Sequence, residues 1–148
     1  MELKQTRLVN SVAFSSFSSD GKQIVFGSGG CVRVCDVLTG ELMELMGNTG
    51  VVQSVSFVRE SKQIVSGSSD NTVCVYDAST GVKLKELNLK GHTGIVSSVS
   101  FASDGMQIVS GSSDNSMHVW DVSTGVKLKE LKGHTDSITS VAFLSNGT

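Results

Sequence analysis

Short runs of alternating apolar and polar residues recur along the chain, separated by turns rich in Gly, Ser, Asp and Thr. Alternation with a period of two is typical of half-buried β-strands. The clearest four runs follow one another at residues 96–101, 107–110, 116–121 and 126–129. Turns such as Asp104-Gly105 and Thr124-Gly125 are too short to hold a helix. The pattern therefore predicts an all-β fold of four-stranded antiparallel sheets.

This four-strand pattern is repeated. The segment from Val99 to Leu131 is echoed closely from Val55 and more loosely from Val12, and the anchors Val12, Val55, Val99 and Val141 stand 43, 44 and 42 residues apart. A fixed period of this size indicates an array of repeats, each one supersecondary unit. We expect one partial array over residues 1–148, with repeats at about 8–47, 51–90 and 95–132 and an incomplete fourth at 137–148.

Several motifs recur in register with the period: Gly91-His92 and Gly133-His134, Asp104-Gly105, Ser110, Asp114 and Trp120-Asp121. On these motifs the sequence resembles the WD-repeat (Trp-Asp repeat) β-propeller family over nearly its whole length. The resemblance implies about three and a third repeats, folded as blades of a partial or open propeller. Because propellers close with about four to eight blades, we expect a fragment of a longer propeller, with further blades in the parent chain. A self-completing oligomer is less favoured, since its junction blade would lack both middle strands.

Composition and net charge limit the classes of partner that this chain is expected to bind. The chain has 148 residues, 39% of them hydrophobic, and 12 basic against 14 acidic residues give a net charge of −2. This charge supplies no attraction to nucleic acid, and no apolar run approaches the roughly 20 residues of a membrane span. The first ten residues lack the apolar centre of a secretory signal, so we expect an intracellular, cytoplasmic protein without membrane insertion.

The three cysteines are Cys31, Cys35 and Cys74. Their odd number and their places in strand-like runs argue against a secreted disulfide framework. Cys31 and Cys35 have no histidine nearby, which falls short of a zinc pattern. We expect structural thiols, no metal site and no cofactor.

His92, Ser110 and Asp114 have the residue types of a hydrolase triad. The resemblance instead assigns them, with Trp120, to a buried hydrogen-bonded tetrad that ties the loop before the first strand to the turn between the second and third strands. Ser110 also lacks the Gly-x-Ser-x-Gly surroundings of a nucleophile elbow. We expect a structural tetrad, with a serine hydrolase as a remote alternative.

The other repeats keep the tetrad unevenly. Offsets of 18, 22 and 28 residues link His92 to its partners, and in the second repeat the same offsets give a degenerate set: Asn48, Ser66, Asp70 and Tyr76. The first repeat has Gln5, Phe26 and Cys35 at aligned positions, so no tetrad is expected there. His134 opens the fourth repeat without partners, and we expect it to be exposed.

The resemblance also implies a partner-binding face on the loops before the first strands and the turns after the second strands. Carried over position by position, its residues are Leu8, Asn10, Val51, Gln53, Ser69, Ile95, Ser97, Ser113, Ser137 and Thr139. This set contains no arginine cluster and no aromatic anchor. The lysines of the outermost strands, Lys83, Lys85, Lys127 and Lys129, are expected to be solvated charges that protect an open sheet edge.

These observations favour a noncatalytic protein–protein interaction scaffold that binds proteins or peptides. An alternative is a recognition or assembly segment of a larger signalling protein with a nucleotide-binding oligomerisation module. The second and third repeats are identical at about two-thirds of aligned positions, including "QIVSGSSDN" and "STGVKLKEL", which indicates recent duplication and makes a variable number of repeats plausible.

Overall fold

The computed structural model of the chain describes residues 9–15, 23–45, 50–58, 62–87, 91–102 and 104–143. The first blade contains β1 (Val9–Ser15), β2 (Gln23–Ser28), β3 (Cys31–Asp36) and β4 (Leu42–Leu45). The second contains β5 (Val52–Val58), β6 (Gln63–Ser68), β7 (Val73–Asp77) and β8 (Lys83–Leu87). The third contains β9 (Val96–Phe101), β10 (Gln107–Ser112), β11 (Ser116–Asp121) and β12 (Lys127–Lys132).

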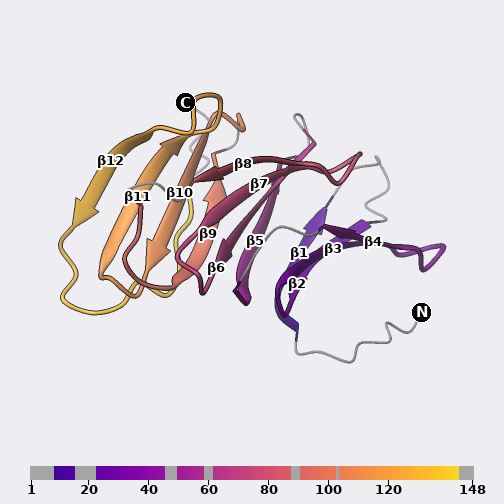
Figure 1. The fold of residues 1–148 in the computed structure, drawn as a ribbon, viewed down its shortest axis with the longest axis horizontal. Coiled ribbons are helices and arrows are strands. Elements are labelled where there is room, and N and C mark those ends of the chain that lie inside the picture. The colour runs from indigo at the N-terminus through magenta and orange to yellow at the C-terminus, as the bar shows by residue number, and fades with distance from the viewer. Residues whose placement is uncertain are drawn as a thin grey trace.

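Each blade is a four-stranded antiparallel sheet whose strands lie in chain order, so every connection is a hairpin. Figure 1 shows the three blades side by side, from β1–β4 on the right to β9–β12 on the left. The described part of the chain contains no helix long and apolar enough to cross a bilayer. The expected all-β class, an open array of propeller blades, is confirmed.

The turn between the third and fourth strands follows the same local chemistry in each blade. In the second blade, Asp77 Oδ1 accepts a hydrogen bond from the Thr80 N–H at 3.0 Å, and Gly81 follows at φ +78°. An aspartate that binds its own turn, followed by a glycine in the left-handed region, reverses the chain with little strain. The equivalent residues are Asp36, Thr39 and Gly40, and Asp121, Thr124 and Gly125.

Neighbouring blades stack through close contact at a glycine. A Cβ built on Gly67 of β6 would lie 2.6 Å from Val96 Cγ1 of the third blade, so only glycine permits this approach. The Val99 N–H also donates to Ser54 Oγ across the same boundary at 3.2 Å. The apolar cluster between these blades includes Val65 and Trp120, and a second cluster joins the first and second blades.

Residues 133–143 continue the array beyond the third blade. Ile138 is buried, and its N–H donates to the carbonyl of Ser112 at 3.0 Å. The Val141 N–H donates to Ser98 Oγ at 3.1 Å, which repeats the link between Val99 and Ser54. This segment therefore packs on the third blade as the first strand of another blade would. His134 is exposed, as expected.

The face of the third blade that points away from the second blade is less buried than the matching face of the second blade. In the second blade, Val73, Val75 and Leu87 face the third blade and are buried. Their counterparts by strand pairing in the third blade are Met117, Val119 and Leu131, and Leu131 is 44% exposed. An apolar row that is buried at an internal boundary is thus open at this end of the array.

Candidate functional site

The four tetrad residues come from four neighbouring elements of the third blade. His92 lies in the loop before β9, Ser110 on β10, Asp114 in the turn between β10 and β11, and Trp120 on β11. Ser110 and Trp120 lie on adjacent strands, where Trp120 is paired with Ile108. The turn brings Asp114 back toward the loop, because Asn115 adopts a left-handed φ of +70° that asparagine tolerates.

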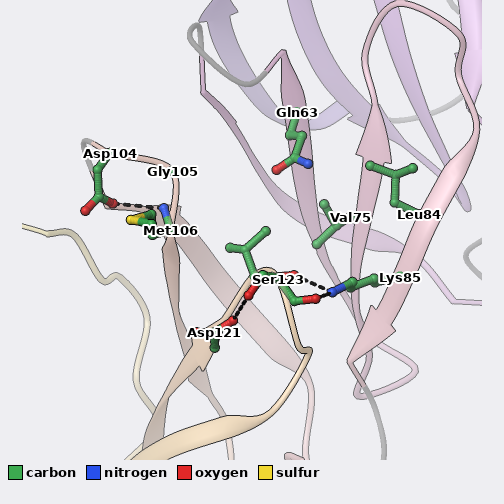
Figure 2. Close-up of a pocket in the computed structure, with 10 residues that line it drawn as sticks. Gln63, Val75, Leu84, Lys85, Asp104, Gly105, Met106, Asp121 and Ser123 are labelled. Carbon is green, nitrogen blue, oxygen red and sulfur yellow. Dashed lines mark hydrogen bonds between the residues drawn. The ribbon is translucent and has the colours of Figure 1, made fainter.

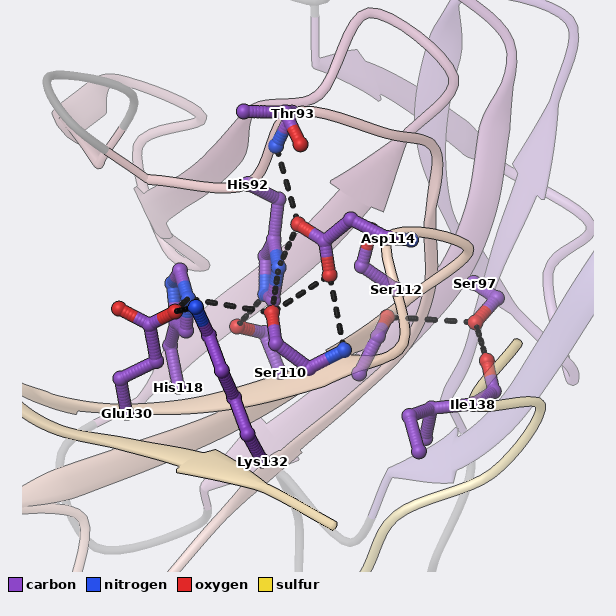
Figure 3. Close-up of polar contacts among 12 residues, drawn as sticks. His92, Thr93, Ser97, Ser110, Ser112, Asp114, His118, Glu130, Lys132 and Ile138 are labelled. Atoms are coloured by element: carbon purple, nitrogen blue, oxygen red, sulfur yellow. Dashed lines mark hydrogen bonds and ion pairs between the residues drawn. The ribbon is translucent and has the colours of Figure 1, made fainter. Parts of the chain in front are cut away.

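A continuous chain of hydrogen bonds joins these side chains, and Figure 3 shows how His92, Ser110 and Asp114 lie in it. Trp120 Nε1–H donates to Ser110 Oγ at 2.8 Å. Ser110 Oγ lies 2.7 Å from His92 Nε2, and His92 Nδ1 lies 2.9 Å from Asp114 Oδ2. Because a carboxylate only accepts, His92 carries its proton on Nδ1, and Nε2 accepts the hydroxyl proton of Ser110. Each of these four side chains therefore has a hydrogen-bond partner inside the blade.

Asp114 joins the loop to the turn. Its Oδ2 accepts from the Thr93 N–H at 3.0 Å, while its Oδ1 accepts from the N–H and the hydroxyl of Ser116 at 2.9 and 2.5 Å. Burial alone would raise the pKa of Asp114, but the hydrogen bonds from Ser116, Thr93 and His92 hold this pKa well below its usual range. The carboxylate stays charged at neutral pH and keeps all of these donors in place.

A second histidine, His118, extends the buried cluster. Its ring stacks on that of His92 with centroids 3.8 Å apart and meets Trp120 edge-on at 5.5 Å. Burial lowers the pKa of His118 to about 4, and the nearby charge of His92 adds to the decrease. Burial also lowers the pKa of His92, although Asp114 opposes that shift. Both rings are therefore neutral at pH 7.

Taken by distance alone, the order Ser110–His92–Asp114 has the polarity of a catalytic triad. However, Ser110 has no exposed surface, and its oxygen already accepts a hydrogen bond from the indole N–H of Trp120. A nucleophile must reach a bound substrate, and this hydroxyl is fully buried in the structure. What the arrangement can do is hold a loop and a turn together.

The second blade keeps part of this arrangement. Asp70 Oδ2 accepts from the Gly50 N–H at 3.2 Å, and its Oδ1 accepts from the Thr72 N–H at 3.0 Å. Tyr76 is fully buried; burial raises its pKa, and a hydrogen bond with Ser66 opposes that shift. Asn48 lies outside the described residues.

The first blade has an apolar interior at the aligned positions. Phe26 and Cys35 are buried, and Gln5 lies outside the described residues. Cys31, Cys35 and Cys74 are all buried and form no disulfide, and burial raises the pKa of Cys74 to about 11. Among the described residues, no group of three His, Cys, Asp or Glu side chains is placed to hold a metal ion.

The loops before the first strands and the turns after the second strands, at the tetrad end of the blades, form the candidate partner-binding face. Val51 and Ile95 are 40% and 42% exposed. The backbone of each is bonded to the neighbouring turn, since the N–H of Ser69 donates to the Val51 carbonyl at 2.9 Å and that of Ser113 to the Ile95 carbonyl at 3.0 Å. The face thus presents aliphatic side chains on a backbone that is held in place.

The remaining residues of this face differ in availability. Ser97 is half-buried, and its hydroxyl donates to the carbonyls of Gly111 and Ile138, so it joins the third blade to residues 133–143. Ser113, Ser137 and Thr139 are exposed, and Gln53 and Ser69 are half-buried. Leu8 and the side chain of Asn10 lie outside what the structure describes.

Two contributors were not expected from the sequence. Ser116 follows Asp114 by two residues, and this Asp-x-Ser spacing is a known turn signal that could have identified it. The alternation of β11 places His118 on the same face as Trp120, but its stacking on His92 depends on the separate loop before β9.

Comparisons with known proteins agree with this geometry. The profile of the family "WD domain, G-beta repeat" matches residues 3–36, 40–77, 82–121 and 125–148. Two curated relatives are similar to the chain. "WD repeat-containing protein SL1-17" of Schistosoma mansoni is 34% identical over 67 residues, which are 45% of this chain and 22% of that protein. "WD repeat-containing protein 82" of Drosophila melanogaster is 36% identical over 77 residues, which are 49% of this chain and 24% of that protein. The chain therefore spans less than a quarter of the length of these relatives.

Among solved structures, the chain is similar to the computationally designed protein Ika4. Their TM-score is 0.82 at 30% identity, over 99% of this chain and 88% of that one. The computationally designed Ika8 protein gives a TM-score of 0.78 at 31% identity, over 93% of this chain and 41% of that one.

Proposed function

Because the chain belongs to the WD40-repeat family, whose repeats generally mediate protein–protein interaction, we propose that it is a noncatalytic scaffold for protein or peptide partners. The observation that carries this proposal is the face above the tetrad. There Val51 and Ile95 are exposed, while hydrogen bonds hold the backbone around them. A preformed surface with exposed aliphatic side chains loses little conformational entropy when a partner binds.

Burial of the Ser110–His92–Asp114 set supports the noncatalytic part of the proposal. Ser110 has no exposed surface, and His92 is 6% exposed. Their hydrogen bonds join the loop that carries Ile95 to the turn that carries Ser113. We assign the set to maintaining the shape of the binding face.

The open row of the third blade supports a longer array. Met117, Val119 and Leu131 stand where the second blade has residues buried by its neighbour. A further blade of a parent chain would cover this row in the same way. A self-completing oligomer is the less favoured arrangement, because its junction blade would have residues 133–143 as a first strand but would lack both middle strands. The buried thiols, which form no disulfide, fit an intracellular location.

Site-specific photo-cross-linking tests the proposed face. A photoreactive benzophenone residue is placed at Ile95, and in a control protein at Leu38, which is exposed at the other end of the strands. We expect discrete protein adducts from position 95, and we expect their yield to fall in a Val51→Glu variant that keeps its fold. Equal adduct patterns from both positions, or adducts insensitive to Val51→Glu, would contradict the assignment of this face.

A further inference from the structure

A cavity of about 360 Å³ lies between the second and third blades, at the end of the strands opposite the tetrad. Figure 2 shows it between β8 of the second blade and two turns of the third, β9–β10 and β11–β12. Because strands alternate in direction, these turns and the loops around the tetrad must lie at opposite ends of the blade. We call this cavity the interblade groove.

The groove is mainly apolar. Val75 and Val122 are buried and line its interior, while Leu84 and Met106 line it with 45% and 67% of their surfaces exposed. Gln63 is the first residue of β6 and places a half-buried amide beside these side chains. Exposed apolar side chains around a cavity are uncommon on a surface that contacts only water, and they are typical of a recognition site.

Leu84 reaches the groove because of a β-bulge. The pairing of β7 with β8 shifts between Val75 and Tyr76, so Leu84 is an extra residue without a partner opposite it. A bulge redirects a side chain and is usually a specific feature of a sheet. In the first blade, Cys35 pairs directly with Leu42, and the equivalent bulge is absent from β3–β4.

Met106 distinguishes this groove from the other repeats. The aligned sequences are "GKQIV" at residues 21–25, "SKQIV" at 61–65 and "GMQIV" at 105–109, so the third repeat has Met106 where the others have Lys22 and Lys62. A lysine is therefore compatible with this turn, and methionine is not required for folding. The exchange removes a positive charge and adds apolar surface at the groove.

All three repeats have acidic residues at the same two aligned positions, whereas the third repeat has replaced the neighbouring lysine. Asp104 and Asp121 both line the groove, and the aligned pairs are Asp20 and Asp36, and Glu60 and Asp77. In the other repeats a lysine accompanies each acidic pair. The cation among the residues that line the groove is Lys85, whose ammonium group donates to the carbonyls of Val122 and Ser123. The groove therefore combines apolar walls with one net negative charge among these three side chains.

We propose that the interblade groove binds an extended peptide segment of a partner protein that carries an aliphatic side chain next to a lysine or arginine. The aliphatic side chain packs against Val75, Leu84 and Met106. The basic side chain pairs with Asp104 and Asp121, and the Gln63 amide bonds the peptide backbone. This site goes beyond the proposed function, since it lies at the opposite end of the blades from the face around Ile95 and would recognise a different segment.

Methyl NMR of the whole chain, labelled with 13C at the methionine methyl groups, tests this binding. The probes are three capped pentapeptides, Gly-Arg-Leu-Arg-Gly, Gly-Arg-Ser-Arg-Gly and Gly-Glu-Leu-Glu-Gly. We expect only the first to shift the Met106 signal in a saturable way, because only it has both the aliphatic and the basic groups. An unshifted Met106 signal with that peptide, or an equal shift with the acidic one, would overturn the proposal.

Two matched variants separate the groove from general charge effects. Met106→Lys restores the residue of the other repeats, whereas Leu38→Lys makes a comparable change at a site that is also 67% exposed but lies in the first blade. We expect Met106→Lys to weaken binding of the basic peptide about tenfold or more, monitored through the backbone amide shifts of groove residues such as Gln63 and Val75, and Leu38→Lys to leave it within about twofold. Equal weakening by both variants would assign the binding to net charge and refute the groove.

Discussion

Replacing Ser110 with alanine should destabilise the protein strongly, because one hydroxyl group serves two buried partners. Ser110 Oγ accepts from Trp120 Nε1 at 2.8 Å and lies 2.7 Å from His92 Nε2. Alanine leaves the indole N–H and the imidazole nitrogen unsatisfied, and each buried unsatisfied group costs about 1–3 kcal/mol. Allowing for partial relaxation, we expect a loss of about 3 kcal/mol in the free energy of unfolding.

Urea unfolding followed by tryptophan fluorescence measures this loss, because Trp120 is the only tryptophan in the chain and is buried. Ser113→Ala is the matched control, since Ser113 is exposed and its replacement should change stability by less than about 0.5 kcal/mol. The double variant Ser110→Ala/His92→Ala should lose less than the sum of the single changes, because both interrupt one chain of hydrogen bonds. A loss below about 1 kcal/mol for Ser110→Ala, or strict additivity, would refute the reasoning.

Three further predictions concern other contacts. Stability should fall as the pH drops from 7 to 5, because the folded-state pKa of His118 lies near 4, below the unfolded value of about 6.5, and the unfolded state therefore binds more protons. Urea titrations should show a loss of about 2 kcal/mol in the free energy of unfolding, and His118→Leu should reduce this pH dependence. Gly67→Ala should cost about 1–3 kcal/mol, because the new Cβ would meet Val96 Cγ1 at 2.6 Å, whereas Gly133→Ala, with open space around it, should be nearly neutral in thermal melts. Lys85→Met should cost about 1–2 kcal/mol through the lost bonds to two backbone carbonyls, and the exposed Lys129→Met should not.

The fold could be predicted because it follows from local rules that the sequence repeats. The alternation within 107–110 and 116–121 reappears as β10 and β11, and the Thr124-Gly125 turn reverses the chain where expected. Each strand pairs with its neighbour in sequence, so no long-range pairing had to be inferred. The positions of β-bulges such as that at Leu84 could not be predicted, since they depend on register between strands.

The tetrad positions of the third repeat were nominated by the resemblance to the WD-repeat family, and fixed offsets then gave the aligned positions of the second repeat. Contacts between repeats were harder to foresee. Lys85, expected to be a solvated edge charge, reaches carbonyls of the third blade, and Ser97, expected on the binding face, bonds to Ile138. Both contacts depend on how one blade packs on the next, and a single repeat carries no signal for that packing.

The most direct test of the central claim, that the Ser110–His92–Asp114 set is structural, is the reaction of the folded protein with a fluorophosphonate serine probe. Modified residues are located by peptide mass spectrometry, at a pH where His92 is neutral. The account predicts that Ser110 is unmodified, because its hydroxyl has no exposed surface and is bonded on both sides. Selective modification of Ser110 in the folded protein, lost in a folded His92→Gln variant, would show a reactive nucleophile and contradict the account.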